Sequence, residues 1–379
     1  MALNTSDAQR YSRHVALREI GEEGQQKIRA AKVLLIGAGG LGSPSALYLA
    51  AAGVGTLGLV DHDRVDVSNL QRQVLYGDAD VGVAKTQAAK ARLQALNPSV
   101  NVQQHEVELR ASNVMSIVAD YDLVLDGTDR FTTRYLSNDA CVLLHKPLVS
   151  AAIHRFEAQA MTYVPAAGPC YRCLFPEPPA DGLVPNCAEA GVLGVLPGVM
   201  GLIQATEALK IIVGAGELLT GRLLTYDALG MRFDEFRFDR REDCAVCGDH
   251  ATITAPRDLA EVCSAADLAA VERIEPRALR ERLEQHAEDY TLIDVREVYE
   301  FESNHLPRSL NIPVKELERR IAEVPTHMRA VFICRSGARS LTASGIAHRL
   351  GVQRTLHLEG GLLAWQRDVD PSLEVAPVK

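Results

Sequence analysis

Short apolar runs alternate with amphipathic segments over the first two thirds of the chain. Four of these runs have the length of buried strands and are followed by glycines or polar turn residues. They lie at 32–37, 56–61, 121–129 and 146–153. The segments 44–54 and 84–98 have helical composition, and Pro98 ends the second. This repeated alternation predicts an α/β fold with a doubly wound, Rossmann-like sheet.

The alternation is interrupted after residue 250 and resumes near residue 275. The intervening segment, 251–274, shows no strong strand pattern and is interpreted as a linker. Two strands and a helix are predicted beyond it, at 290–297, 330–340 and 341–350. We therefore expect a first domain over 1–250 and a second, smaller α/β domain over 275–379.

The composition is that of an ordinary globular protein, with 47% hydrophobic and 23% charged residues. The net charge of −9 argues against nucleic acid as a partner. The N-terminal residues show no apolar core of signal-peptide length, and glycines interrupt the long apolar runs. We expect a cytoplasmic protein without a membrane segment.

A glycine-rich turn follows the first predicted strand, in the stretch LLIGAGGLGSP. Gly37, Gly39 and Gly42 fit the G-x-G-x-x-G spacing of a nucleotide-binding turn before a helix. The backbone N–H groups at such a helix N-terminus suit an anionic phosphate. Asp61 ends the next strand about 20 positions on, where an acidic residue binds a ribose hydroxyl. The turn alone does not distinguish NAD from another nucleotide.

A dense polar segment after the second strand favours a nucleoside triphosphate. It contains Asp63, Asn69, Gln71, Arg72 and Gln73. Three further charged residues are Lys85, Arg13 and Asp129. Converging basic groups would offset the charge that develops at an attacked phosphorus, a need that hydride transfer lacks. Asp129, at the end of a strand, would suit Mg²⁺ together with phosphate oxygens.

Four cysteines form two C-x-x-C pairs, in CYRC and CAVC. They are Cys170, Cys173, Cys244 and Cys247. Two such pairs suit a closed, tetrahedral Cys₄ zinc site, which is structural because it leaves no position for a substrate. Cys141 and Cys263 have no partner motif and are interpreted as structural or linker residues.

Two other cysteines are candidates for thiol chemistry. Cys187 lies in VPNCAEAGV, and the prolines and the glycine around it predict a mobile loop. Cys334 ends a predicted strand in AVFICRSGARS and precedes a short loop and a helix. The loop amides and the helix dipole would stabilise a thiolate or persulfide anion there. Arg339 follows at C-x₄-R, a tighter loop than the phosphatase spacing, which favours sulfur over phosphate.

Whole motifs now connect the chain to two known families. Residues 10–248 resemble the MoeB/ThiF branch of the ubiquitin-activating enzymes, the molybdopterin-synthase adenylyltransferases. The matching stretches are RYSRH, GAGGLGSP, GVGTLGLVDHDRVDVSNLQRQ, VGVAK, DGTD, PCYRCLFP, CAEAGVLG and CAVCG. Residues from about 275 to 372 resemble a rhodanese sulfurtransferase domain through LIDVRE, HLPRSLNIP, CRSGARS and LEGGLLAW. The fusion is similar to proteins that activate ubiquitin-like sulfur carriers.

The resemblance implies an ATP site in the first domain and a persulfide site in the second. The nucleotide-binding residues would be Gly37, Gly39, Gly40, Gly42, Asp61, Asp63, Ser68, Asn69, Gln71, Arg72, Lys85, Asp129 and Arg130. Gly40 and its neighbours would contact phosphates, Asp61 the ribose, and Asp129 Mg²⁺. The catalytic residues would be Arg13, Arg72, Lys85, Asp129, Cys187 and Cys334. Arg13 would reach the other subunit's site in a homodimer, and the four paired cysteines would bind zinc.

The implied activity is ATP-dependent adenylylation of the C-terminal Gly-Gly carboxylate of a sulfur-carrier protein. A persulfide on Cys334 would then give a thiocarboxylate. The sulfur donor would be a cysteine desulfurase or thiosulfate. The pathway stays open among molybdopterin (molybdenum cofactor) biosynthesis, thiamine, cysteine and tRNA thiolation. Two other hypotheses are an NAD-dependent oxidoreductase with a rhodanese appendage and a non-enzymatic zinc scaffold for a ubiquitin-like partner.

The chain departs from the two families at two positions. Arg130 stands where the adenylyltransferases have asparagine after the aspartate, so a second contact from this position is in doubt. Arg308 stands where rhodanese domains commonly have glycine. We expect the second departure to alter one turn and to leave the Cys334 loop intact.

Overall fold

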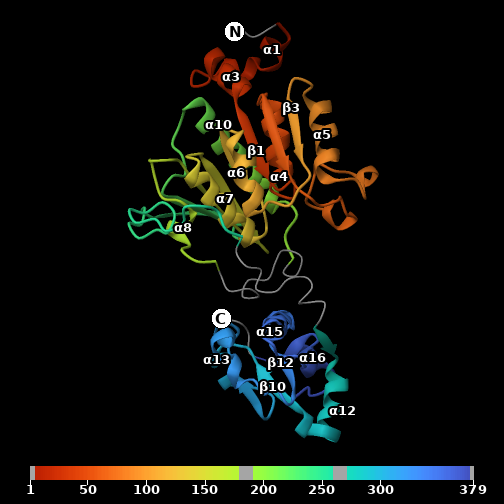
Figure 1. Cartoon of the computed structure of the whole chain (residues 1–379). Helices are drawn as coiled ribbons and strands as arrows, with labels where there is room; N and C mark the ends of the chain where they lie inside the picture. Colours follow the sequence, from red (N-terminus) through yellow and green to blue (C-terminus); the bar gives the residue numbers. More distant parts are fainter. Residues whose placement is uncertain (1–4, 179–190, 259–270, 376–379) are drawn as a thin grey trace. The chain divides into compact units, whose positions relative to one another are not determined.

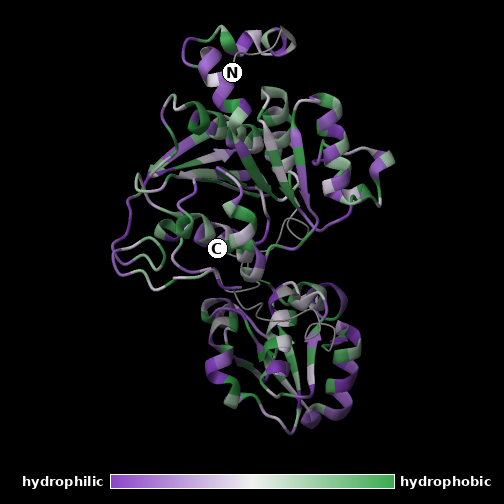
Figure 2. Ribbon diagram, turned by 45° about the horizontal axis from the view of Figure 1, so that its top comes forward, coloured by the Kyte–Doolittle hydropathy of each residue, from purple (hydrophilic) through white to green (hydrophobic). Residues whose placement is uncertain are grey.

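The computed structural model describes residues 5–178, 191–258 and 271–375, which form two compact units (Figure 1). The first two ranges belong to one unit and the third to the other. Each unit has its own sheet and its own hydrophobic core. In Figure 2 the central strands of both units carry mainly hydrophobic residues.

The first unit is built on an eight-stranded mixed sheet with the order β3-β2-β1-β4-β5-β6-β7-β8. Strands β1 to β5 pair in parallel, and β6, β7 and β8 add an antiparallel extension. The parallel strands are β1 (Lys32–Ile36), β2 (Thr56–Val60), β3 (Asn101–His105), β4 (Leu123–Asp126) and β5 (Leu148–His154). The antiparallel strands are β6 (Glu157–Tyr163), β7 (Arg222–Asp227) and β8 (Arg232–Arg237).

Helices cover both faces of this sheet. They are α1 (Thr5–Arg10), α2 (Ser12–Val15), α3 (Gly21–Ala30), α4 (Gly42–Ala52), α5 (Lys85–Leu96), α6 (Ala111–Ala119), α7 (Phe131–Leu143), α8 (Tyr171–Leu174) and α10 (Leu196–Val213). Val33 and Leu35 of β1 pack in a core with α3, α4, α5 and α10, whereas Leu34 and Ile36 pack in another core with α6 and α7. This alternation is the period-2 pattern of a strand buried on both faces.

Helix α10 is long and apolar enough, by length and composition alone, to cross a membrane. It packs instead against α4 and against β5 and β6. Its buried Glu207 accepts hydrogen bonds from Thr162 Oγ1 at 2.7 Å and from the Leu219 backbone N–H at 2.8 Å. These contacts make α10 a core helix of the first unit.

The second unit is a five-stranded parallel sheet with the order β11-β10-β12-β13-β9. Its strands are β9 (Glu272–Ile274), β10 (Tyr290–Asp294), β11 (Ser309–Asn311), β12 (Arg329–Ile333) and β13 (Thr355–Leu358). Its helices are α12 (Pro276–His286), α13 (Val298–Ser303), α14 (Leu317–Arg320), α15 (Ala338–Arg349) and α16 (Gly361–Asp368). One core cluster includes α14 and α15, and the other includes α12 and α16, so helices cover both faces.

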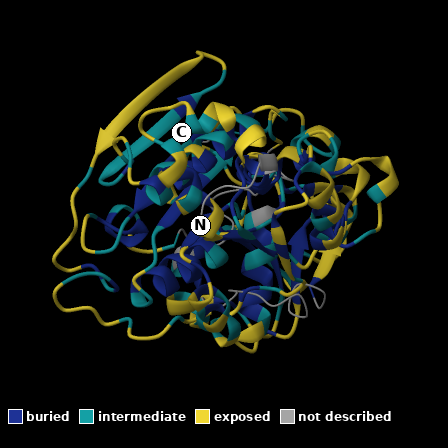
Figure 3. Ribbon diagram, turned by 90° about the horizontal axis from the view of Figure 1, so that it is seen from above, coloured by how far each residue is buried: buried dark blue, intermediate teal, exposed yellow. Residues whose placement is uncertain are grey.

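The structure confirms the predicted α/β fold and corrects it in two places. The expected linker, 251–274, ends in the edge strand β9. This strand has three residues and a single buried apolar side chain, Ile274, too short a pattern for a sequence-based prediction. The antiparallel strands β6, β7 and β8 were also not predicted. In β8 the pattern lacks a buried face, because all six of its residues are exposed (Figure 3).

Arg308 adopts a left-handed backbone conformation with φ of +67°. This is the position at which the family resemblance leads one to expect glycine. The arginine therefore occupies a turn of glycine-like geometry, which costs a residue with a Cβ about 1–2 kcal/mol.

Arg308→Gly is expected to stabilise the second unit by about 0.5–1 kcal/mol, because the relieved strain exceeds the extra unfolded-state entropy of glycine. Urea unfolding followed by tryptophan fluorescence measures this, since Trp365 is the single tryptophan of the chain and is buried in the second unit. Arg308→Ala is the control, because it removes the guanidinium and keeps the Cβ. An equal gain in both variants would contradict the assignment to backbone strain.

Candidate functional site

The glycine turn forms a close backbone crossing at the carboxyl edge of the first sheet. Gly37 has φ of +91°, and a Cβ on Gly42 would lie 2.0 Å from the Gly37 carbonyl oxygen. A Cβ on Gly37 would lie 3.0 Å from the carbonyl oxygen of Gly127, which follows β4. The third glycine is also the first residue of α4, two positions before the predicted start. Glycines at these positions let the turn after β1 contact the turn after β4 at the N-terminus of α4.

Asp61 fixes this turn from the end of β2. Its Oδ2 accepts a hydrogen bond from the Ala38 backbone N–H at 2.9 Å, and its Oδ1 accepts one from the Asp63 N–H at 2.9 Å. Burial raises the pKa of the Asp61 carboxyl, and the nearby Lys85 ammonium opposes this shift. Each carboxylate oxygen keeps a second lone pair, so Asp61 can still accept from a ribose hydroxyl.

Residues 66–73 pack against the glycine turn. A Cβ on Gly40 would lie 3.7 Å from Arg72 Cγ and 3.1 Å from Pro197 at the start of α10. A Cβ on Gly39 would lie 3.7 Å from the Gln73 amide nitrogen. The structure thus brings the predicted phosphate-binding glycines and Arg72 together. Arg72 is partly exposed, and one of its guanidinium nitrogens donates to the Ser68 carbonyl at 2.9 Å.

Ser68 and Asn69 have local roles in this structure. The Asp66 carboxylate accepts from the Ser68 N–H at 2.8 Å and from its hydroxyl at 2.6 Å. Asn69 Oδ1 accepts from the Asp66 N–H at 3.3 Å. These bonds cap the short 3-10 turn Val67–Asn69 and hold the segment in place beside the glycines.

Lys85 and Asp63 form an ion pair with each other beside the glycine turn. Lys85 Nζ lies 2.8 Å from Asp63 Oδ2, and the lysine side chain is 7% exposed. Burial acts to raise the pKa of Asp63, but the hydrogen bond and charge of Lys85 outweigh it, and the pKa is lowered. A phosphate at the turn would share the ammonium with this carboxylate.

The turn after β4 is held by a buried ion pair that the sequence did not reveal. Asp126 Oδ2 lies 3.1 Å from Arg134 Nε, and its Oδ1 accepts from the Thr128 N–H at 3.0 Å. Arg134 also donates to the Thr128 carbonyl at 2.8 Å. Asp129 is exposed on this turn, and its side chain has no polar partner among the described residues. Asp129 thus belongs to the turn whose Gly127 and Thr128 lie against Gly37 of the glycine turn.

Three other predicted site residues are Arg130, Arg13 and Gln71. The Arg130 guanidinium lies 3.0 Å from the Glu108 carboxylate, and its positive charge also acts to lower the pKa of Asp63. Its role as a nucleotide contact stays a prediction. Arg13 is exposed on α2. Gln71 is exposed, and its backbone carbonyl lies against Gly194, whose Cβ would sit 2.4 Å from it.

The two C-x-x-C pairs come together although more than 70 residues separate them. The four Sγ atoms of Cys170, Cys173, Cys244 and Cys247 lie within 4.8 Å of one another and could hold a metal ion. The sulfur of Cys170 lies 3.6 Å from that of Cys244, and the sulfur of Cys173 lies 3.3 Å from that of Cys247. Gly248 closes the second knuckle, since a Cβ there would lie 2.4 Å from the Glu242 carbonyl.

Three further cysteines were singled out in the sequence. Cys141 is fully buried in the core of the first unit, and burial raises the pKa of its thiol, as befits an inert structural residue. Cys187 and Cys263 lie outside the described residues.

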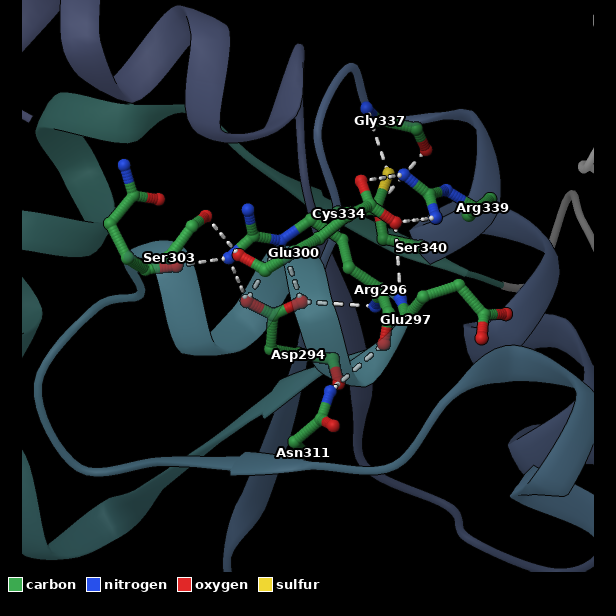
Figure 4. A network of polar contacts seen from close by, with 11 residues as sticks. Asp294, Arg296, Glu297, Glu300, Ser303, Asn311, Cys334, Gly337, Arg339 and Ser340 are labelled. Atoms are coloured by element: carbon green, nitrogen blue, oxygen red, sulfur yellow. Dashed lines mark hydrogen bonds and ion pairs between the residues drawn. The ribbon is translucent and has the colours of Figure 1, made fainter. Parts of the chain in front are cut away.

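Cys334 ends the central strand region of the second unit, between β12 and α15. Its Sγ accepts a hydrogen bond from the Gly337 backbone N–H at 3.1 Å (Figure 4). Gly337 has φ of +98°, and the turn at Gly361 packs so closely that a Cβ there would lie 2.4 Å from the Cys334 carbonyl oxygen. Close glycine contacts thus fix the loop, and the Gly337 N–H is a backbone donor that would stabilise an anionic sulfur on the buried Cys334.

The hydrogen bonds of Arg339 go to a carboxylate beside the Cys334 loop. Its two terminal nitrogens lie 2.7 and 2.8 Å from the Glu300 carboxylate, a bidentate ion pair (Figure 4). Burial acts to raise the pKa of Glu300, but the hydrogen bonds and charge of Arg339 outweigh it and lower it. The pair fastens the loop to α13, and a second pair, Asp294–Arg296 at 2.7 Å, fixes the neighbouring strand end. Sequence spacing identified Arg339 and missed Glu300, because their separation carries no local signal.

Comparisons with known proteins agree with both units. The ThiF family matches residues 11–246, and the rhodanese-like domain matches residues 275–368. The chain is 43% identical over 383 residues to the probable adenylyltransferase/sulfurtransferase MoeZ of Mycobacterium tuberculosis H37Rv, covering 98% of this chain and 96% of that protein. It is 42% identical to the adenylyltransferase and sulfurtransferase MOCS3 of Mus musculus, covering 97% of this chain and 87% of that protein.

Solved structures support the fold of the first unit. A structure of E. coli MccB with MccA-N7isoASN aligns with a TM-score of 0.58 and 24% identity, covering 65% of this chain and 75% of that one. A structure of E. coli MccB with ATP aligns with a TM-score of 0.56 at 24% identity, covering 63% of this chain and 74% of that one. The expected adenylyltransferase and rhodanese architecture is confirmed. The chain belongs to the ThiF family and carries a C-terminal rhodanese-like domain.

Proposed function

We propose that this protein is an ATP-dependent adenylyltransferase and a sulfurtransferase that acts on a ubiquitin-like sulfur carrier ending in Gly-Gly. The observation that carries the proposal is the presence, in one chain, of the glycine turn beside Arg72 and the Cys334 loop. Relatives that match nearly the whole chain are named for both activities. Two activities in one chain allow the unstable acyl-adenylate to be consumed by the protein that makes it.

The adenylation step follows from the groups at the first sheet's edge. The carrier carboxylate attacks the α-phosphorus of ATP, a P–O bond forms, and pyrophosphate leaves. The α4 N-terminus, Arg72 and Lys85 would offset the charge on the phosphates. Asp61 would hold the ribose. The exposed Asp129 fits Mg²⁺, which binds one or two carboxylates with phosphate oxygens and would neutralise charge on the leaving pyrophosphate.

The sulfur step follows from Cys334. A donor, either a cysteine desulfurase or thiosulfate, transfers sulfane sulfur to the thiolate and leaves a persulfide. The persulfide sulfur attacks the carrier carbonyl, and AMP leaves with the carboxylate oxygen. A thiolate, which we assign to Cys187, then attacks the Cys334 sulfur and releases the carrier thiocarboxylate. The resulting Cys187–Cys334 disulfide returns to thiols at the expense of a cellular dithiol.

We infer that the four-cysteine cluster binds structural zinc. A tetrahedron with Zn–S bonds of about 2.3 Å places neighbouring sulfurs roughly 3.8 Å apart, close to the 3.6 Å between Cys170 and Cys244. The ion would tie α8 to residues 244–247. Thiolate zinc and a persulfide both suit a reducing compartment, which supports a cytoplasmic location.

We also infer a homodimer in which Arg13 contributes to the partner's site. The exposure of Arg13 on α2 supports this, because its guanidinium is available to a second chain. Sedimentation at the 41.2 kDa chain mass under assay conditions would contradict it.

Carrier-dependent exchange of pyrophosphate into ATP tests the adenylation. We expect Asp129→Asn to lower the exchange rate by about 100-fold, because a charged ligand at the phosphates is lost. Cys334→Ala should leave exchange intact and abolish thiocarboxylate, which mass spectrometry of the carrier measures. Glu108→Gln, next to Arg130 on the same edge, is the matched control for a carboxylate without a phosphate role. An oxidoreductase or a scaffold would show no carrier-dependent exchange in any variant.

Removal of the metal tests the cysteine cluster. We expect one zinc per chain by elemental analysis, and about half or less in Cys244→Ser, since a tetrahedral site loses one of four thiolates. Chelation should lower the unfolding temperature seen by circular dichroism, while the Trp365 transition of the second unit stays unchanged. Cys141→Ser is the control, because Cys141 lies outside the cluster. Full metal content in Cys244→Ser would show that these sulfurs do not hold the ion.

A further inference from the structure

A buried histidine lies behind the Cys334 loop. His357 is on β13, 4% exposed, and its Nδ1 lies 3.4 Å from Ser340 Oγ on α15. Its Nε2 is buried and has no hydrogen-bond partner among the described residues. A buried N–H without an acceptor is more costly than a bare lone pair. The ring proton therefore belongs on Nδ1, where it donates to Ser340.

The surroundings of His357 favour the neutral form of the ring. Burial lowers the pKa of His357, and the positive charge of Arg273 on β9 lowers it further. Glu359 acts in the opposite direction. On the α15 side the facing groups are Ser340 and, beyond it, Cys334, whose neighbour Arg339 is neutralised by Glu300. A neutral ring with its proton on Nδ1 donates a hydrogen bond from that atom.

Ser340 connects this donor to the reactive sulfur. Its hydroxyl is fully buried, donates to the Gly337 carbonyl at 3.0 Å, and lies 3.6 Å from Cys334 Sγ, whose thiol donates to it. A hydroxyl carries one proton and two acceptor lone pairs. With a thiol in place, the proton points to Gly337. With an anionic sulfur in place, rotation of the hydroxyl turns the same proton toward Cys334.

We propose that His357 is a positioning residue for sulfur transfer: its Nδ1–H holds the Ser340 oxygen, so that the Ser340 hydroxyl donates to the anionic sulfur of Cys334. This inference rests on the proposed role of Cys334. His357 takes up no proton in the step, and the proton of the Cys334 thiol leaves to solvent. Together with the Gly337 N–H, the serine gives the anion a second donor, which requires only rotation of the hydroxyl.

The pH dependence of Cys334 alkylation in the full-length protein tests this chain of donors. The rate of iodoacetamide labelling, quantified on the Cys334 peptide by mass spectrometry, follows the thiolate fraction as the pH changes. Because Cys334 is buried, the midpoint of the pH profile is compared rather than the absolute rate. We expect Ser340→Ala to raise the midpoint by about one pH unit, a tenfold loss of thiolate below the midpoint. His357→Leu should shift it the same way by about half as much. Trp365 fluorescence shows that each variant remains folded.

Matched variants separate positioning from packing. Ser340→Thr keeps the hydroxyl and His357→Asn keeps an N–H near the Nδ1 position, so both should restore the midpoint. Ser340→Ala/His357→Leu should shift no further than Ser340→Ala, because His357 acts through the serine. Equal shifts in His357→Asn and His357→Leu, or an unchanged midpoint in Ser340→Ala, would overturn the proposal.

The wild-type protein offers a second test that needs no variant. Nitrogen-15 NMR of histidine-labelled protein is expected to show the neutral His357 ring with its proton on Nδ1 across the pH range of the alkylation assay. A proton on Nε2 would overturn the proposal. Neither measurement involves ATP or the carrier, so a negative result would leave the adenylation proposal standing, and failed pyrophosphate exchange would leave this one standing.

Discussion

The backbone crossing of Gly37, Gly42 and Gly127 is the constraint on which the adenylation site depends. A Cβ on Gly42 would lie 2.0 Å from the Gly37 carbonyl, so the turn can exist only without side chains there. The crossing brings the N-terminus of α4 to the edge where β1, β2 and β4 end. Asp61 and the turn bearing Asp129 come from those neighbouring strands. The backbone at these glycines therefore sets where the α4 N-terminus, Asp61 and Asp129 lie relative to one another.

Both units use the same device to fix a loop at the end of a parallel strand. Asp126 ends β4 and Asp294 ends β10, and each accepts a hydrogen bond from the backbone N–H two residues on. Each is also paired with a buried arginine, Arg134 or Arg296. Removing one partner of such a pair leaves an uncompensated buried charge, which typically costs about 3–5 kcal/mol. The functional loop of each site therefore begins at a strand end that a buried ion pair holds in place.

The sequence predicted those parts whose signal is local. The glycine turn, the C-x-x-C pairs and the Cys334 loop each lie within a few residues, and their strands have continuous apolar runs. Contacts between distant segments were not predictable in this way. Glu300 neutralises Arg339 from 39 positions away, and His357 reaches Ser340 from 17. Strand β9 was not predicted, because it forms by pairing with β13 and its own residues carry no clear strand pattern.

The central claim is that one chain makes the acyl-adenylate of the carrier and then attacks it with a persulfide on Cys334. It is tested most directly with a carrier whose C-terminal carboxylate is labelled with oxygen-18, incubated with ATP, the protein and a sulfur donor. If the carboxylate attacks the α-phosphorus and sulfur displaces AMP, one labelled oxygen appears in AMP and the carrier leaves as a thiocarboxylate. Unlabelled AMP alongside a thiocarboxylate would contradict the account, because the carrier would then have been activated by another route.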